Sequence, residues 1–318
     1  MKKKLKIAIQ MDPLEKLDLS GDSTFAIGLE AQKRKYNLFH FTPDHLFYKN
    51  KKVFAKTISL TLGFQNGHEH FKYGKSETHE LSKFDIILMR QDPPFDLAYI
   101  TATHLLEKIS KKTLIINNPY EVRNAPEKIF VTQFEQIMPK TMITRDVESI
   151  KLFRHKYKDI IIKPLYGNGG EGVFRIKPKD ENFNTIIEMF LKQHKEQFMV
   201  QEYLADVRKG DKRIILIDGE TIGAINRVPA VGDSRSNMHA GGTPKKTKLT
   251  ENDHLICKTI SPFLKEKGLF FVGIDIIGKY ITEINVTSPT GIREINKFNK
   301  IKVEQIFWDK LEKKLLNH

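Results

Sequence analysis

The chain has 318 residues, 40% of them hydrophobic, which favours two or three domains with cores of their own. It carries 53 lysines and arginines against 39 aspartates and glutamates, a net charge of +14. No apolar run approaches the roughly 18 residues that a membrane-spanning helix needs, and a single cysteine, Cys257, excludes an internal disulfide framework. We therefore expect a protein of the reducing cytoplasm that does not enter the membrane.

The excess of positive charge raises the question of nucleic-acid binding. The lysines are scattered, no basic stretch alternates with stacking aromatics, and the sequence holds no Cys/His cluster of the zinc-binding type. Lysines on solvated faces, or a basic cleft for a small polyanion such as ATP, explain the charge better. The sequence therefore predicts no nucleic-acid partner.

The first 122 residues alternate between expected strands and helices. Runs rich in β-branched and aromatic residues predict strands at 5–10, 36–41, 84–89 and 113–117. Apolar residues at helical spacing predict helices at 23–35 and 97–109. This order is typical of a parallel sheet with helices on both faces.

Residues 60–80 interrupt the alternation. They have no strong period, and they contain three glycines and three histidines, His68, His70 and His79. The histidines lack the tight spacing that metal ligands usually show. We expect a surface excursion in this segment.

Two of the expected strands end in polar residues followed by proline. Asp12 follows the first strand, and Arg90 and Asp92 follow the third. Ligands of open α/β sheets bind at the carboxyl ends of strands, where Arg90 and Asp92 would suit a zwitterionic substrate. Asp-Pro also begins ordinary turns, so simple turn chemistry is an equal alternative.

A linker at 118–126 leads into an expected helix at 127–138. Pro126 is a good residue for helix entry. Lys128 falls in the first turn, where a cation opposes the helix dipole. The local sequence favours a solvated lysine, but the misfit leaves room for a functional one.

An expected strand at 159–164 leads into a glycine-rich segment at 165–172, which we call the flap, and a second strand follows. The glycines at 167, 169 and 172 match G-x-G-x-x-G. A dinucleotide-binding fold would need a helix after the loop, and a Walker A loop would need Lys-Ser/Thr at its end. Neither follows here, so the pattern favours a flap that lays backbone N–H groups over phosphates, although a flexible hairpin tip is the simpler alternative.

Two features beside the flap suit ATP. Lys163 lies in the apolar strand that enters the flap, where it is placed to pair with the α- and β-phosphates. A further strand is expected at 198–204, and the backbone at its end is suited to hydrogen-bond an adenine edge. That end consists of Gln201, Glu202, Tyr203 and Leu204.

A hairpin is expected at 211–227, because Asp218-Gly219 is a strong turn signal between alternating strands. Arg213 and Arg227 flank it, and arginine binds carboxylates and phosphates through two parallel hydrogen bonds. Residues 228–243, the covering loop, have no period and are typical of an active-site cover or a disordered segment. Helices are expected at 250–267 and 303–315.

The segment 271–290 predicts a hairpin that turns at Gly278-Lys279 and carries three oxygen ligands. Asp275 lies in an apolar run, and Glu283 and Asn285 point to one face of the second strand. Such ligands suit Mg²⁺, although an ordinary half-solvated hairpin is an alternative. A shared site requires Asp275 opposite Glu283, and we predict this register, with Ile277 opposite Ile281, through a longer loop or a bulge.

The order of these features along the chain resembles the ATP-grasp superfamily of carboxylate–amine ligases. The features are Lys128, Lys163 with the flap, the segment 201–204, Arg213 and Arg227, and the hairpin at 271–290, which we call the acidic hairpin. Four segments narrow the resemblance to the prokaryotic glutathione synthetase family: MRQDPPFD at 89–96, GDKR at 210–213, FVGIDIIG at 271–278 and TEINVTSPTGIRE at 282–294. The match runs over nearly the whole chain.

The resemblance implies an α/β (α+β) ATP-grasp fold. It places an N-terminal parallel-sheet domain at 1–122, a lid subdomain with the flap at 123–204, and a C-terminal catalytic subdomain at 205–318. The nucleotide would lie between the last two. A homotetramer is the oligomer expected for the family.

The resemblance also implies that ATP, γ-glutamylcysteine and glycine give glutathione, ADP and phosphate through an acyl phosphate. Arg213 and Arg227 would stabilise the transferring phosphoryl group. The expected ATP-binding residues are Lys128, Lys163, Gly167, Asn168, Gly169, Gly170, Gln201, Glu202, Tyr203, Leu204 and Asp211. Asp275, Glu283 and Asn285 would hold two Mg²⁺ ions, with Mn²⁺ as a possible substitute. The expected contacts to the other substrates are Asp12, Arg90, Ser288, Pro289, Thr290 and Arg293.

Other readings use some of the same features. Another ATP-grasp ligase would share the phosphate-binding residues and differ near Asp12, Arg90 and 288–293. A protein kinase should show His-Arg-Asp and Asp-Phe-Gly, and neither tripeptide occurs. A nucleic-acid-binding protein would depend on the charge alone.

Overall fold

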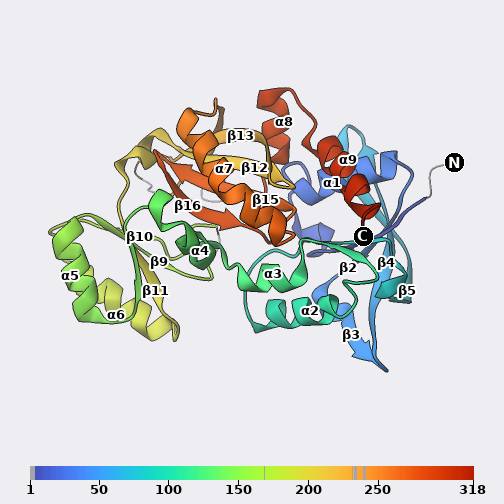
Figure 1. Ribbon diagram of the computed structural model, residues 1–318, viewed down its shortest axis with the longest axis horizontal. Coiled ribbons are helices and arrows are strands. Elements are labelled where there is room, and N and C mark those ends of the chain that lie inside the picture. Colours follow the sequence, from blue (N-terminus) through green and yellow to red (C-terminus); the bar gives the residue numbers. More distant parts are fainter. Residues whose placement is uncertain (1–3, 168, 231, 233–234, 239–240) are drawn as a thin grey trace.

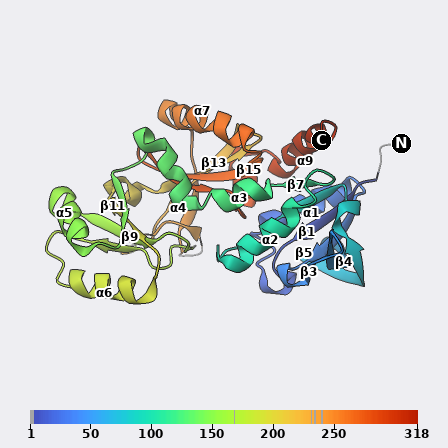
Figure 2. The ribbon, with the colours of Figure 1, turned by 60° about the horizontal axis from the view of Figure 1, so that its bottom comes forward.

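The computed structural model describes residues 4–167, 169–230, 232, 235–238 and 241–318. Asn168 and parts of the covering loop therefore lie outside the described residues. The molecule is elongated, with the N-terminal sheet at one end and the lid subdomain at the other (Figure 1 and Figure 2). No helix in the described ranges is long and apolar enough to span a bilayer.

The strand β1 (Lys6–Gln10) lies at the centre of the N-terminal sheet. It pairs in parallel with β2 (Asn37–Phe41) and β6 (Ile86–Met89), and β6 pairs in parallel with β7 (Leu114–Ile116). The four strands predicted from the sequence are confirmed to within two residues at each end. β6 and β7 are buried throughout, which explains their continuous apolar runs.

The two predicted helices of this region are confirmed as α1 (Ser23–Lys33) and α2 (Leu97–Glu107). Each begins after an aspartate whose side chain accepts a hydrogen bond from a backbone N–H of the first turn, at 2.5 Å for Asp22 and 2.9 Å for Asp96. These caps satisfy donors that the helix itself leaves unpaired.

Residues 60–80, expected to be a surface excursion, are a regular element whose second strand is largely exposed. This segment belongs to a long antiparallel hairpin of β4 (Lys52–Gln65) and β5 (His68–Glu80), and β4 also pairs with β2 and with β3 (Leu46–Lys49). The pairing register shifts between Ile58 and Leu60. This irregularity breaks the apolar alternation that identifies a strand, and β5 is largely exposed.

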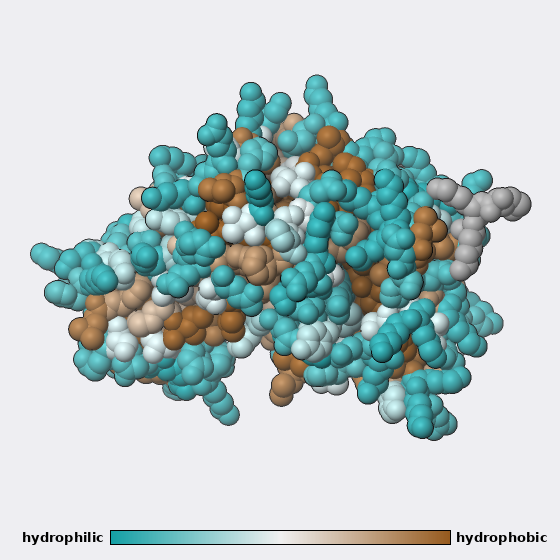
Figure 3. All heavy atoms as spheres, in the orientation of Figure 1, coloured by the Kyte–Doolittle hydropathy of each residue, from teal (hydrophilic) through white to brown (hydrophobic). Residues whose placement is uncertain are grey.

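The lid subdomain contains an antiparallel sheet in the order β10-β9-β11-β8. The three strands predicted in this region are confirmed as β9 (Ile160–Pro164), β10 (Phe174–Ile176) and β11 (Phe198–Glu202). The structure adds elements that had no prediction: β8 (Thr141–Thr144), α5 (Val147–Tyr157) and α6 (Phe183–Gln193). These helices and the sheet share one apolar core, and the subdomain forms a separate lobe bounded by a notch in the surface (Figure 3).

The C-terminal sheet has the order β14-β13-β12-β15-β16. Both predicted hairpins are confirmed, the first as β12 (Asp211–Ile217) and β13 (Glu220–Val228), the second as β15 (Phe271–Ile277) and β16 (Tyr280–Asn285). The edge strand β14 (Thr243–Lys246) was not predicted, since it follows the covering loop with no apolar alternation of its own.

Helices cover this sheet and connect it to the N-terminal region. The two predicted helices are confirmed as α7 (Glu251–Glu266) and α9 (Val303–Leu315), and Thr250 and Asp253 form a capping box at the start of α7. A third helix, α8 (Ile292–Asn299), occupies a segment that the sequence analysis assigned only to substrate contacts.

The linker and the helix predicted at 118–138 need correction. The linker contains a short helix, α3 (Pro119–Asn124), and the expected single helix is α4 (Glu127–Phe130) followed by a tighter, kinked 3₁₀ segment. Phe134 has non-helical backbone angles. Phe130 and Phe134 are both buried in the main core, so tertiary packing overrides the helical preference here.

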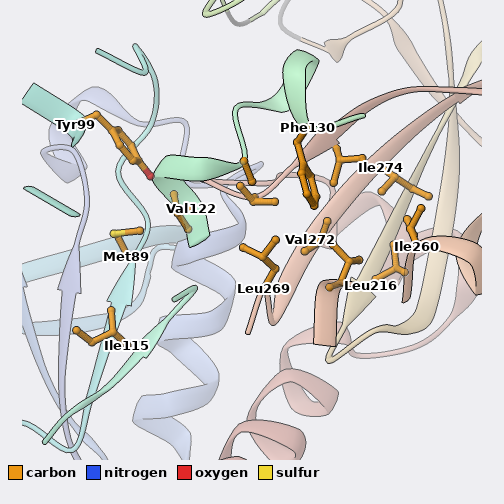
Figure 4. Packing of buried hydrophobic residues seen from close by; sticks show 14 of the residues in the cluster. Met89, Tyr99, Ile115, Val122, Phe130, Leu216, Ile260, Leu269, Val272 and Ile274 are labelled. Atoms are coloured by element: carbon orange, nitrogen blue, oxygen red, sulfur yellow. The ribbon is translucent and has the colours of Figure 1, made fainter. Parts of the chain in front are cut away.

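One apolar cluster joins the N-terminal and C-terminal regions (Figure 4). Val122 and Leu269 lie between Met89 of the first sheet and Val272 of the other. Because the lid subdomain has its own core, the two sheets pack as one body and the lid as another. The exact boundaries at 122 and 204 remain predictions.

Trp308 on α9 provides a test of this arrangement. The side chain is fully buried, its indole N–H donates to the carbonyl of Ile27 at 2.8 Å, and its ring contacts Tyr36 edge-on. We expect Trp308→Ala to lower the free energy of unfolding by about 3–5 kcal/mol, measured by urea denaturation. Leu316→Ala, at an exposed site, should change it by less than about 0.5 kcal/mol. If both substitutions lowered the free energy of unfolding by equally small amounts, Trp308 would not be packed in the core as described.

Candidate active site

A pocket of about 440 Å³ lies where the three regions meet. It brings together most of the residues predicted from the sequence, which come from strands, loops and a helix far apart in the chain. The described ones that line it are Lys128, Lys163, Gly167, Gly169, Gly170, Gln201, Glu202, Tyr203, Leu204, Asp211, Arg213, Arg227, Asp275, Glu283, Asn285, Ser288, Pro289 and Thr290.

Three predicted substrate contacts do not line the pocket. Arg90 is buried behind it and donates to the carbonyl of Pro289 at 3.1 Å and to the hydroxyl of Thr24 at 3.0 Å. Asp12 accepts a hydrogen bond from the backbone of Asp92. The guanidinium of Arg293 lies 3.6 Å from Glu69 of β5. As placed here, Arg90 and Asp12 contact residues that line the pocket.

The acidic hairpin has the register that a shared metal site requires. Asp275 lies directly opposite Glu283, as predicted. The pairing nearer the turn was predicted wrongly, since Ile277 pairs with Tyr280 rather than with Ile281. A two-residue turn is followed by a bulge next to Asp275, and the extra residue on β16 brings the two carboxylates to one face.

A row of charges crosses this face of the sheet. Arg213 on β12 is opposite Asp275, which is opposite Glu283. Arg213 holds both oxygens of Asp275, at 2.5 and 2.9 Å. The side chains of Arg213 and Pro289 both pack closely against Gly273. A Cβ at this position would lie 2.9 Å from the proline side chain, so a larger residue would not fit. Directly opposite residues share a face, so the row is a consequence of strand register.

Arg227 closes the network on the other side. Its guanidinium contacts Asp211 at 2.6 and 2.8 Å and Asp275 at 2.9 Å. Burial alone would raise the pKa of Asp275, but Arg213 and Arg227 hold it well below its usual range. For Asp211, burial prevails over Arg227 and raises the pKa. The charge of Asp275 is therefore the better compensated of the two.

Two lysines converge on Glu283 from different elements, Lys128 from α4 and Lys163 from β9. The ammonium groups of Lys128 and Lys163 lie 3.6 and 3.7 Å from its carboxylate. Burial opposes the charge of Glu283, and the two lysines overcome this and lower its pKa. Lys128 also donates to the carbonyl of Gly167 at 2.7 Å, which connects it to the flap. The local sequence favoured a solvated lysine, and the structure instead buries Lys128 against the flap.

Glu127 is a pocket residue that the sequence analysis missed. Burial raises the pKa of its carboxyl to about 7, although the neighbouring Lys128 opposes the shift. An acidic residue in the first turn of a helix is ordinary, so no local pattern marked Glu127 as a pocket residue. Thr287 also lines the pocket, and its place two residues beyond Asn285 is the only signal that pointed to it.

The residues present fit a divalent ion bound together with phosphates. In the described ranges no three His, Cys, Asp or Glu side chains gather as a complete metal site. Mg²⁺ usually takes only one or two carboxylates and completes its shell with water and substrate phosphates. Asp275 and Glu283 would supply two, and Asn285, which lines the same pocket, would add its side-chain oxygen. These residues fit such an ion, and their role as metal ligands stays a prediction.

The fold belongs to a known class of ATP-dependent enzymes. The solved structure of the ATP-grasp ligase PsnB in complex with a minimal precursor superposes with a TM-score of 0.63 at 18% identity, covering 97% of this chain and 99% of the other. The family model of the prokaryotic glutathione synthetase ATP-grasp domain matches residues 127–300. The chain is an ATP-grasp ligase in fold, as the sequence predicted.

The second match defines the family more narrowly. The model of the prokaryotic glutathione synthetase N-terminal domain matches residues 5–123. Glutathione synthetase of Agrobacterium fabrum is 56% identical over 308 residues, covering 97% of this chain and 96% of the relative. That of Mesorhizobium japonicum is 53% identical, covering 98% and 99%. The chain belongs to the prokaryotic glutathione synthetase family.

The raised pKa of Glu127 predicts a pH dependence of stability. A carboxyl whose pKa is higher in the folded state contributes stability below its unfolded pKa, and this contribution is lost as pH rises toward about 7. Above pH 7 we expect Glu127→Gln to have a free energy of unfolding higher than that of the parent by on the order of 1–3 kcal/mol, measured by urea denaturation. The difference should shrink toward pH 5. Glu148→Gln, at an exposed site, should show no such trend. Parallel curves for Glu127→Gln and the parent would refute the assignment.

Proposed function

We propose that the residues of this pocket carry out the reaction of the family, the joining of γ-glutamylcysteine to glycine at the expense of ATP. The chain is an ATP-dependent ligase that makes glutathione, and ATP and a divalent metal ion are its cofactors. The observation that carries the assignment of roles is the row of Arg213, Asp275 and Glu283, which faces Lys128 and Lys163 across one pocket.

ATP would bind between the lid subdomain and the C-terminal sheet. Lys128 and Lys163 would hold its phosphates, since both are buried and directed at the same carboxylate. The described flap glycines would cover the phosphates, and the same role is expected of Asn168, which lies outside the described residues. The adenine would lie against the segment that ends β11, whose members are Gln201, Glu202, Tyr203 and Leu204. Asp211 would act through Arg227.

The metal would be held by Asp275, Glu283 and Asn285. We propose two Mg²⁺ ions, with Mn²⁺ as a substitute, because three oxygen ligands can be shared between two ions when phosphates complete the shells. When bound, the metal neutralises phosphate charge and orients the oxygens for transfer.

The chemistry needs positioning and charge neutralisation rather than a protein nucleophile. The cysteinyl carboxylate of γ-glutamylcysteine attacks the γ-phosphorus, and ADP leaves. The amine of glycine then attacks the acyl carbon, and phosphate leaves. Arg213 and Arg227 would stabilise the charge that develops in both steps. Cys257 is buried in the core and takes no part.

The dipeptide substrate would lie against the loop after β16, at Ser288, Pro289 and Thr290. Arg90 would fix this loop through the Pro289 carbonyl, and Asp12 and Arg293 would support the site from outside the pocket. The covering loop would exclude water, because an exposed acyl phosphate hydrolyses.

A homotetramer and a cytoplasmic location remain predictions. Light scattering on the purified chain tests the first, for which we expect about four times the 36.9 kDa of one chain. A monomer at micromolar concentration would exclude the tetramer without affecting the chemistry.

Activity measurements test the assignment of the site. We expect ADP release to require both γ-glutamylcysteine and glycine, and to fall by roughly 10²-fold or more in Glu283→Gln and Asn285→Ala, because each removes a charge or ligand used in the transition state. Glu220→Gln, at the exposed start of β13, is the matched control and should retain activity. If both site variants kept full activity, the proposed metal site would be wrong. If another amine or carboxylate replaced a substrate, the substrate assignment would change.

A further inference from the structure

The side chain of Asn117 joins the N-terminal sheet to the acidic hairpin. Asn117 follows β7 directly and is buried. Its amide nitrogen donates to the carbonyls of Phe271 and Val286, at 2.8 and 2.7 Å, and its amide oxygen accepts from the backbone N–H of Phe271 at 2.8 Å. Two carbonyls and one N–H fix which way the amide points. Both amide hydrogens therefore bind the backbone of the hairpin that carries the proposed metal ligands.

At Phe271 this side chain takes the place of a neighbouring strand. Residues of an antiparallel strand form their hydrogen bonds alternately to one neighbour and to the other. The carbonyl of Phe270 accepts from the backbone N–H of Asp218, on the β12 side, at 2.7 Å. The N–H and carbonyl of Phe271 therefore point to the β16 side. There Asn117 satisfies both groups, as a paired residue of β16 would.

The pairing of β15 with β16 stops next to this point. Its last pair is Gly273 with Asn285. The same register would place the start of 287–290, which we call the exit segment, opposite Phe271. The exit segment lines the pocket instead. The chain thus leaves the sheet after Asn285, at the pairing position that Asn117 occupies.

The neighbouring strand holds the exit segment at a second point. Arg90 follows β6, which pairs in parallel with β7, and it donates to the carbonyl of Pro289 at 3.1 Å. Asn117 holds the carbonyl of Val286, which directly precedes the exit segment. Two residues at the carboxyl ends of adjacent strands therefore fix the path of this backbone.

We propose that Asn117 is a positioning residue, which ends the β15–β16 pairing and directs the exit segment into the reaction pocket. Through this segment and the adjoining Asn285, it sets where the dipeptide substrate and the metal are held. The inference rests on the proposed function, which places the dipeptide at 288–290 and the metal at Asn285. Asn117 itself does not line the pocket, so it acts through the backbone of the hairpin.

Two substitutions remove different parts of the contact. Asn117→Ala removes all of its hydrogen bonds, whereas Asn117→Asp keeps an oxygen for the N–H of Phe271 and turns a second oxygen toward two carbonyls. We expect kcat/KM for γ-glutamylcysteine to fall about 10- to 100-fold in both variants, since a misplacement of about 1 Å can cost about 10²-fold. The Mg²⁺ concentration that gives half-maximal ADP release should rise with it.

The neighbouring asparagine provides a matched control. The side-chain oxygen of Asn118 caps α3 by accepting from the backbone N–H of Tyr120 at 3.0 Å. Aspartate caps a helix as well as asparagine does. Asn118→Asp therefore makes the same chemical change one residue away, and kcat/KM should stay within about twofold of that of the parent.

Binding of ADP in the presence of EDTA distinguishes positioning from general damage to the pocket. Without metal, the nucleotide depends on the lid residues and lysines, which share no partner with Asn117. In both Asn117 variants the Kd for ADP should therefore change by less than about threefold. A variant that disturbs the whole pocket would weaken ADP binding as much as it lowers kcat/KM for the dipeptide.

Hydrogen exchange followed by mass spectrometry tests the contact itself. The backbone amide of Phe271 should exchange faster in Asn117→Ala, which lacks its acceptor, and should stay protected in Asn117→Asp. Peptides from β1, in the same body, should keep the protection of the parent. If Asn117→Ala does not fold, Asn117→Ser should show a smaller loss of kcat/KM in the same direction, because its hydroxyl can still donate to one carbonyl.

The outcomes separate this inference from the proposed function. If the parent forms no glutathione from its substrates, the proposed function fails, and exchange at Phe271 still tests the contact. If kcat/KM for γ-glutamylcysteine is unchanged in the Asn117 variants, or ADP binding weakens equally, Asn117 does not position the exit segment. A selective loss of kcat/KM, with faster exchange at Phe271 in Asn117→Ala, would establish the role.

Discussion

Asp275 is a buried carboxylate between two arginines, and the arrangement of the active face follows from it. Removing a carboxylate from water costs several kcal/mol, which close ion pairs offset only with good geometry. Arg213 provides that geometry with two hydrogen bonds, and Arg227 adds a third while also holding Asp211. Each of these side chains needs its strand in one register, so the chemistry of the site and the pairing of β12, β13 and β15 constrain each other.

The charged residues around the pocket are attached to two different apolar cores. The arginines, Asp275 and Lys128 are attached to the core that joins the two larger sheets. Lys163 belongs to the lid subdomain, which has its own core. Glu283 is the residue on which both lysines converge. A displacement of the lid would therefore change the electrostatics at Glu283 first, while the row on the C-terminal sheet would stay in place.

Local patterns in the sequence predicted most of the elements that form the site. Strand period and the Asp218-Gly219 turn located both hairpins, and the need for a shared ligand set predicted that Asp275 faces Glu283. The bulge that produces this register could not be located, because its position depends on pairing partners rather than on local propensity. A similar shift in β4 concealed the β4–β5 hairpin altogether.

Residues whose role depends on tertiary packing were the ones that sequence reasoning missed or misplaced. Glu127 looked like an ordinary first-turn acid, and only its burial beside Glu283 makes it unusual. The Phe95–Tyr166 stack joins segments 71 residues apart in sequence, and no periodic pattern connects them. Such contacts form between separate parts of the fold, so the sequence pattern of a single strand or helix cannot predict them.

Arg90 was predicted as a substrate contact, and the structure places it behind the pocket rather than in its lining. It was identified at a strand end, where ligands of α/β sheets bind. Its guanidinium is instead buried against the ring of Phe271 and donates to Thr24 and Pro289. Burial lowers the pKa of Arg90, because removal from solvent destabilises the charged guanidinium. The guanidinium thus acts on the pocket from behind, since the carbonyl it holds belongs to the same loop as Ser288 and Thr290. The strand-end rule located the site, and the packing of two sheets decided which side chains face the pocket and which support it.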